Sequence, residues 1–394
     1  MKQWKNYGPV TLATDELREK IRGKKIALMM NTTAIDNEGR LLIDVIVSEK
    51  WAEVAFFFGM EHGVRGNLYA GDGKLSDVDE KTGIKIVNLY EYFELRPPVE
   101  EIEKVDAVVF CAQDVGVRHW TYTPWLLTLV EACAKAGREV IVLDRPNPIR
   151  GDIVEGATAD EQYANTWTGL IGGDYPLRHG MTIGELALMH NDEKKLGAKL
   201  TVLKMKGWRR DMWYDETGLV WVPGSPNMPD TDTPLFFAAT GLMQSANFSL
   251  GIGTTTPFEF VGAPDFDGEL LANELNALDL PGIYFIQKYY MAMTYLNPNE
   301  GEDRVLELCN GAFMVINDRN IWRPVETQLY IMDTLNRIFP DKVNFEHKKD
   351  ERVRMCTDKI CDALNEHKSL LPVIEEWKKG AEEFRVRRAK YLLY

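Results

Sequence analysis

The chain has 394 residues, of which 45% are hydrophobic and 27% charged, and its 46 basic and 60 acidic side chains give a formal net charge of −14. A chain of this length can bury a large core and is long enough for two domains. The negative charge argues against a nucleic acid or an anionic membrane surface as partner. No apolar stretch approaches the roughly 20 residues that span a bilayer.

The N-terminal residues and the cysteines bear on the cellular compartment. Met1 to Tyr7 lack the apolar core of a secretory signal, so we expect a cytoplasmic protein, or a secreted or periplasmic one if a signal has been removed. The five cysteines are odd in number and include no C-x-x-C pair, which argues against a disulfide framework or a zinc site. We expect all five as reduced thiols that mostly pack in the core.

Strands and helices are predicted to alternate up to about residue 205. Apolar runs predict strands at 25–30, 54–58, 84–89, 107–112, 140–143 and 200–205. Apolar residues at helical spacing predict helices at 41–50, 124–136 and 183–191. Such alternation is typical of right-handed βαβ units. We therefore expect an α/β fold built on a parallel sheet with helices on both faces.

The second half of the chain gives a more mixed pattern. A stretch rich in Pro and Gly at 218–233 predicts a long ordered loop, and a helix is expected after it at 234–246. We place a domain boundary near Pro257, which gives domains of 1–256 and 257–394. In the second domain we expect a strand at 312–316 and helices at 268–277 and 327–338. A terminal helix is expected to run to about residue 390.

Polar side chains cluster where predicted strands end. Glu61, His62 and Arg65 follow the second strand, and further sets follow the fourth and fifth strands or precede the helix at 183–191: Asp114, Arg118, Tyr122, Asn147, Arg178 and His179. Ligands of open α/β sheets bind just outside the carboxyl ends of the strands. One polar loop would be an ordinary turn, but four that converge on one sheet edge indicate a site.

Several familiar chemistries have no support in the sequence. The turn after the first strand reads Met30-Asn31-Thr32-Thr33 and carries no G-x-G-x-x-G, so a dinucleotide cofactor is not expected. P-loop, H-E-x-x-H and G-x-S-x-G patterns are also missing from the sequence. We therefore expect neither a cofactor nor a metal ion.

Motifs spread along nearly the whole chain resemble one enzyme family. They include Glu61–Gly66, Gln113–Arg118, Asp144–Pro148, Arg178–Leu186, Ser225–Pro229, Gly253–Thr255, Pro257–Glu259 and Tyr391–Tyr394. In this order they resemble the exo-β-N-acetylmuramidase family of glycoside hydrolases (NamZ-type), long filed as a domain of unknown function. The resemblance implies a Rossmann-like domain beside a smaller C-terminal α/β domain, with the site in the cleft between them. It also implies release of terminal β-linked N-acetylmuramic acid from peptidoglycan fragments, a reaction of cell wall recycling.

Glycosidic cleavage needs a proton donor at the leaving oxygen and stabilisation of an oxocarbenium-like centre. Glu61 is our candidate acid; its alternative interpretation is an ion pair with Arg65 or Arg118. A 2-acetamido sugar can supply its own nucleophile, which requires a polar residue that orients the amide. Asp114 is our first choice for that role and Asp72 the second.

The remaining candidates bind substrate. The lactyl carboxylate of muramic acid calls for a guanidinium, supplied by Arg65, Arg118 or Arg178. The motifs that match the family add hydroxyl-binding and other polar candidates, namely His62, Tyr122, Asn147, His179, Asn227 and Thr254. Trp120 and Trp221 either stack on a sugar ring or pack in the core.

The chain also departs from the family pattern. Gln244, Leu250 and Ile252 stand where the resemblance leads us to expect Glu, Glu and Arg. The chain is thus a divergent member. Two alternatives stay open: a non-catalytic protein that binds muropeptide-like acidic sugars, and a hydrolase of unrelated acidic metabolites. The sequence leaves the aglycone, the anomeric outcome and the oligomeric state undetermined.

Overall fold

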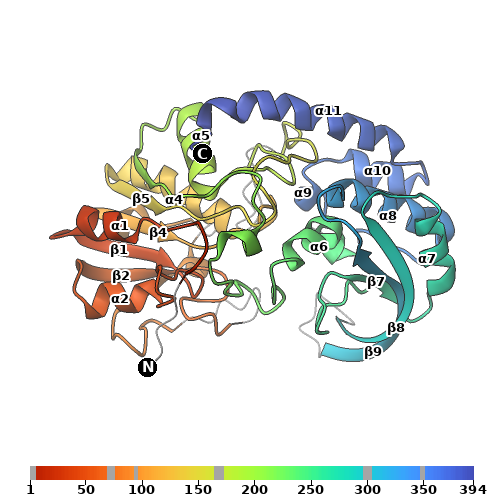
Figure 1. Ribbon diagram of the computed structural model, residues 1–394, viewed down its shortest axis with the longest axis horizontal. Helices are drawn as coiled ribbons and strands as arrows, with labels where there is room; N and C mark the ends of the chain where they lie inside the picture. The colour runs from red at the N-terminus through yellow and green to blue at the C-terminus, as the bar shows by residue number, and fades with distance from the viewer. Residues whose placement is uncertain (1–5, 69–75, 93–95, 164–172, 296–303, 347–350) are drawn as a thin grey trace.

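The computed structural model describes residues 6–68, 76–92, 96–163, 173–295, 304–346 and 351–394. Figure 1 shows two bodies side by side, with the long helix α11 (Leu371–Arg388) running along both. In the part of the chain described, no helix combines the length and the apolar character that a membrane crossing requires. The five cysteines are all free and buried, as expected.

The first body is built on a six-stranded sheet in the order β3-β2-β1-β4-β5-β6. Its strands are β1 (Lys25–Met30), β2 (Glu53–Gly59), β3 (Lys85–Asn88), β4 (Ala107–Cys111), β5 (Glu139–Leu143) and β6 (Lys199–Leu203). Every neighbouring pair is parallel. This sheet confirms the α/β class and the six strands predicted from apolar runs.

Helices cover both faces of this sheet. They are α1 (Thr14–Ile21), α2 (Leu42–Ser48), α3 (Val99–Ile102), α4 (Tyr122–Ala136) and α5 (Ile183–Glu193). Strand β1 is buried at five of its six residues, and alternate residues enter two separate apolar clusters. Because side chains of a strand point alternately to opposite faces, the two clusters are the two sides of the sheet.

Local sequence fixes where the helices end and begin. Helix α4 stops at Gly137, whose φ of 66° is the left-handed conformation that glycine adopts without strain. Helix α5 begins with a capping box in which the Thr182 side chain accepts from the Glu185 amide, and Glu185 accepts from the Thr182 amide. The described residues also form four short 3₁₀ helices: η1 (Leu89–Glu91), η3 (Tyr214–Thr217), η4 (Gly241–Ser245) and η5 (Ala389–Tyr391).

The second body is smaller and has an antiparallel sheet in the order β7-β9-β8. Its strands are β7 (Phe260–Ala263), β8 (Ile283–Tyr295) and β9 (Arg304–Ile316), and its helices α6 (Thr233–Thr240), α7 (Gly268–Asn276), α8 (Pro324–Ile338), α9 (Glu351–Met355) and α10 (Lys359–Asn365), with α11 after them. It confirms the smaller α/β domain. The sequence analysis found only the end of β9 and did not find β7 or β8.

Two features bear on how the bodies join. Helix α6 packs against the second body, where the Phe236 ring lies 5.5 Å from that of Trp322; the boundary expected near Pro257 stays a prediction. After α11 the chain returns to the first body. There the Tyr394 hydroxyl donates to Asp144 at 2.7 Å and the Leu393 amide to Glu185 at 2.7 Å. The C-terminal segment therefore ties the two bodies together.

Candidate active site

The parallel sheet brings the polar loops to one edge. Since all six strands run the same way, Asn31 after β1, Glu61 after β2 and Asp114 after β4 share that edge. The order reverses between β1 and β4, and there the Gln113 amide donates to the Thr33 hydroxyl at 2.8 Å. Such reversal points are where open α/β sheets hold their ligands.

Glu61 lies beside two tyrosines at this edge. Its residue is only 4% exposed, and the Tyr90 hydroxyl donates a hydrogen bond to its Oε2 atom. The buried Tyr122 hydroxyl donates to the Gly224 carbonyl at 2.7 Å. Burial raises the pKa of Tyr122, and the negative charge of Glu61 raises it further. The carboxyl of Glu61 is therefore surrounded in part by aromatic hydroxyl groups.

His62 holds the turn that follows Glu61. Its φ of 63° is left-handed, a conformation that residues other than glycine seldom adopt. The ring Nδ1 atom lies 3.0 Å from the Leu68 carbonyl, and since a carbonyl only accepts, Nδ1 carries the proton. This turn places Glu61 and His62 in one strained segment, and backbone strain of this kind gathers at functional sites.

Arg65 is committed to two carboxylates. Its Nε and Nη2 atoms make a bidentate pair with Asp79, both at 2.7 Å, and Nη1 reaches Asp44 at 2.9 Å. These bonds hold the pKa of Asp79 down, to about 2. A substrate carboxylate would have to compete with these partners, of which Asp79 is buried. Arg65 as a ligand for the lactyl group stays a prediction. The bonds to Asp79 and Asp44 also argue against its pairing with Glu61.

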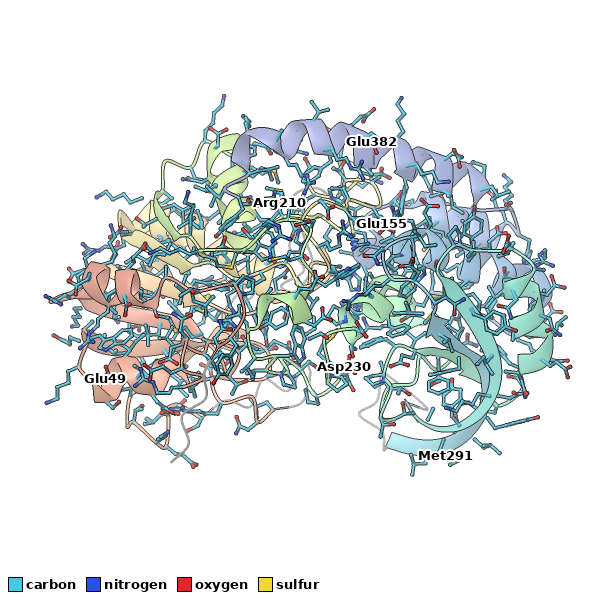
Figure 2. All side chains as sticks on the ribbon, in the orientation of Figure 1. Glu49, Glu155, Arg210, Asp230, Met291 and Glu382 are labelled. Carbon is cyan, nitrogen blue, oxygen red and sulfur yellow. The ribbon has the colours of Figure 1, made fainter. Side chains whose placement is uncertain are left out.

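The guanidinium groups of Arg118 and Arg178 are buried and already bound, and their role as substrate ligands also stays a prediction. Arg118 donates to the carbonyls of Ala157, Tyr175 and Met355 at 2.9–3.0 Å. Arg178 pairs with Glu155, which also accepts from the Val325 amide. Figure 2 shows Glu155 below α11, near α8. These two arginines join the bodies of the molecule.

Asp114, His179 and Asn147 come together, but in the interior. Asp114 is 3% exposed and accepts from the Gly116 amide at 2.7 Å and the Thr123 hydroxyl at 3.0 Å. His179 Nε2 lies 3.3 Å from Asp114 Oδ2, while its Nδ1 accepts from the Met181 amide. Asn147 uses both ends of its amide on main-chain atoms of Met181 and Ile149. These contacts support the loop that follows β4, and direct contact of Asp114, His179 and Asn147 with substrate stays a prediction.

The other expected contacts have varied surroundings. Asn227 is partly exposed, and the Thr254 hydroxyl donates to the Gly251 carbonyl at 2.7 Å within its own turn. Trp120 and Trp221 pack in aromatic clusters, and the Trp221 Nε1 atom donates to the Met228 carbonyl. Asp72 lies outside the described residues. Of the predicted substrate contacts, His62, Tyr122 and Asn227 are the ones that no buried ion pair holds.

Gln244, Leu250 and Ile252, the three positions at which the resemblance leads us to expect charged residues, have uncharged side chains. Leu250 is buried and Ile252 is partly buried against the main apolar cluster. The Gln244 amide donates to the Gly241 carbonyl at 2.9 Å. These side chains stabilise the loop before β7 by packing and a local hydrogen bond.

Tyr90 and Glu259 were given no role in the sequence analysis. Tyr90 contacts Glu61, as described above. Glu259 is half-buried, and burial, followed by the charges of Asp230 (labelled in Figure 2) and Asp232, raises its pKa to about 7. It follows Phe258, whose φ is 70°. The Pro257-Phe258-Glu259 motif was the only signal for Glu259, and none singled out Tyr90.

Three cavities among the described residues are not lined by Glu61. These cavities, of about 200, 140 and 590 Å³, are lined in part by α11 or by the residues that follow it. The candidate site is therefore defined by the strand ends and the groups around Glu61.

Comparison with known proteins agrees with this architecture. Family models described as the N-terminal and C-terminal parts of the exo-β-N-acetylmuramidase NamZ match residues 26–232 and 235–394. The chain belongs to the NamZ family. It is 35% identical over 379 residues to the peptidoglycan β-N-acetylmuramidase NamZ of Bacillus subtilis (strain 168), covering 96% of this chain and 89% of the relative.

Solved structures support the fold of the NamZ family for this chain. A DUF1343 family protein of Bacteroides fragilis NCTC 9343 superposes with a TM-score of 0.86 at 31% identity, covering 98% of this chain and 99% of the other. A second DUF1343 family protein of that organism gives a TM-score of 0.73 at 25% identity, with the same coverage of both chains. The two-domain architecture is thus shared over nearly the whole length.

Proposed function

We propose that this protein is an exo-acting glycoside hydrolase that releases terminal β-linked N-acetylmuramic acid, or a related 2-acetamido sugar, from peptidoglycan fragments. The observation that carries the proposal is the match of both NamZ domains end to end, with Glu61 at the carboxyl end of β2. The 35% identical relative is itself named for that activity. The reaction needs no cofactor.

Glu61 acts as the general acid in this proposal. It gives a proton to the glycosidic oxygen as the bond to the anomeric carbon breaks and the bonding electrons leave with that oxygen. The substrate's own acetamido oxygen stabilises the carbon centre, and water then opens the intermediate with Glu61 as base. Asp114 supports the loop after β4 and acts through the fold, because its oxygens already accept from Gly116 and Thr123.

The second candidate function is a non-catalytic binding protein for muropeptide-like acidic sugars. What favours it is the apolar packing of Leu250 and Ile252, at positions where the resemblance leads us to expect charged side chains. Both functions require the same sugar, so only turnover separates them.

The test compares chromogenic 2-acetamido glycosides of the muramic and glucosamine types. We expect release from the muramic form, and Glu61→Gln should lower the rate by roughly a hundredfold or more, the range for a lost general acid. Glu53→Gln is the matched control, since Glu53 begins β2 at the opposite edge of the sheet. Binding without release in the wild type would favour the binding protein. Near-normal turnover by Glu61→Gln would assign the acid to another residue.

A further inference from the structure

Tyr90 is fixed from two sides before it reaches Glu61. It lies in η1, which follows β3, and its amide donates to the Asn88 side chain at 3.1 Å. Its ring stands edge-to-face on Trp125 of α4, with centroids 6.0 Å apart and an interplanar angle of 82°. Turn and ring packing together restrict the phenol, so little freedom is left for its hydroxyl group.

Strand register explains why Tyr90 meets Glu61. Strands β2 and β3 are parallel neighbours, and their last paired residues are Gly59 and Asn88. Glu61 and Tyr90 each come two residues after that pair. The two side chains therefore leave the sheet at the same level, and the Tyr90 hydroxyl donates to Glu61 Oε2. This bond depends on the pairing of two strands and not on a short sequence motif.

We propose that Tyr90 is the positioning residue for Glu61, aiming its carboxyl at the glycosidic oxygen and stabilising the carboxylate formed when the proton is transferred. This inference rests on the proposed function. During the step the proton moves from Glu61 to the leaving oxygen, and Tyr90 keeps its own proton. A hydrogen bond donated to a carboxylate favours the charged form, which is the form that this transfer produces.

Tyr122 does not share this role. Its hydroxyl donates to the Gly224 carbonyl, so it contributes a surface near Glu61 and not a bond to its carboxyl. The two tyrosines thus donate to different acceptors, although both lie near the Glu61 carboxyl.

The first experiment is Tyr90→Phe, with kcat and KM measured across pH on the muramic glycoside. We expect kcat to fall by about tenfold or more while KM changes little, and the alkaline limb of the rate profile to move to higher pH. Tyr391→Phe is the matched control, because its hydroxyl donates to Asp192 at 2.6 Å on the surface of the first body. An increase in KM alone, or an alkaline limb that stays in place, overturns the proposal.

A second variant keeps the tyrosine ring and is expected to shift the alkaline limb of the rate profile in the opposite direction. Replacing Tyr90 with 3-fluorotyrosine retains the hydroxyl and makes it a stronger donor, so the alkaline limb should move to lower pH. A shift in the same direction as Tyr90→Phe would contradict the role of the hydroxyl. This variant keeps the test decisive if Tyr90→Phe folds poorly.

Carboxyl ¹³C resonances of labelled glutamate separate this inference from the proposed function. The Glu61 signal is assigned by its loss in Glu61→Gln and recorded without substrate. We expect its chemical shift to change in Tyr90→Phe, because the hydrogen bond to the carboxyl is lost, and an unchanged signal overturns the coupling. If the signal moves but the wild type cleaves no glycoside, the coupling stands and the proposed function fails.

Discussion

Replacement of Arg65 by Ala tests whether this arginine holds the fold or the substrate. Asp79 is 3% exposed and takes two bonds of 2.7 Å from Arg65. Its pKa is lowered from 3.8 to about 2, first by the hydrogen bonds from Arg65. At 1.36 kcal/mol per pKa unit this shift corresponds to about 2 kcal/mol. Since the Arg65 side chain is 23% exposed and partly screened, we expect a loss of about 1–2 kcal/mol at pH 7.

The pH dependence of that loss follows from the sign of the shift. A carboxyl with a lowered pKa in the folded state stabilises the fold above its unfolded value, near pH 4, and this stabilisation disappears as the pH falls through about 2. In equilibrium urea unfolding, the free energies of unfolding of Arg65→Ala and the wild type should therefore differ at pH 7 and approach each other near pH 2. Lys81→Ala is the control, since Lys81 is exposed and pairs with Asp44, the outer carboxylate of this cluster.

The same variant decides between two roles. If Arg65 is structural, Arg65→Ala should leave the ratio of affinities for N-acetylmuramic acid and N-acetylglucosamine unchanged in calorimetric binding. Unchanged stability together with a selective loss of the acidic sugar would refute the ion-pair interpretation and favour Arg65 as a substrate ligand.

Two further predictions concern other buried carboxyls. Burial and the charges of two nearby aspartates raise the pKa of Glu259 to about 7. The folded state therefore binds this proton more tightly than the unfolded state, and the free energy of unfolding falls as the pH rises from about 4.5 to 7. In urea unfolding, Glu259→Gln should reduce this dependence on pH and be more stable than the wild type at pH 8 by about 1 kcal/mol after screening. The Tyr394 hydroxyl donates to Asp144, whose pKa burial raises to about 6. Tyr394→Phe should cost about 1 kcal/mol and lower the calorimetric Tm, and an unchanged Tm would show that the C-terminal contact contributes nothing.

The fold was predictable because its signals are local. Continuous apolar runs such as Ala107–Cys111 are typical of strands buried on both faces, and the parallel order places all their carboxyl ends at one edge. Strand β8 was not predicted because its exposed and buried residues share similar side chains: Tyr289 is 63% exposed while Tyr290 is buried. Buried and exposed residues alternate in such a strand, but polar and apolar residues do not, so the sequence lacks the pattern by which a strand is recognised.

The site was only partly predictable, since partners across the chain are set by tertiary structure. The edge that carries Glu61 follows from topology. That Asp79 would bind Arg65, or that a carbonyl 237 residues away at Met355 would bind Arg118, has no local signal. Tyr90 is a similar case, because only the pairing of Gly59 with Asn88 brings it to Glu61.

The distribution of these partners bears directly on the proposed chemistry. A general acid must hold its proton until the moment of transfer, and a charged guanidinium in contact with it would favour the ionised form more strongly than a neutral hydrogen-bond donor does. Arg65 directs its donors to Asp79 and Asp44, and Arg118 directs its own to main-chain carbonyls that join the two bodies. The Tyr90 hydroxyl, a neutral donor, contacts Glu61 Oε2. The arginines thus stabilise the architecture around the edge, while a tyrosine orients the carboxyl that we propose to transfer the proton.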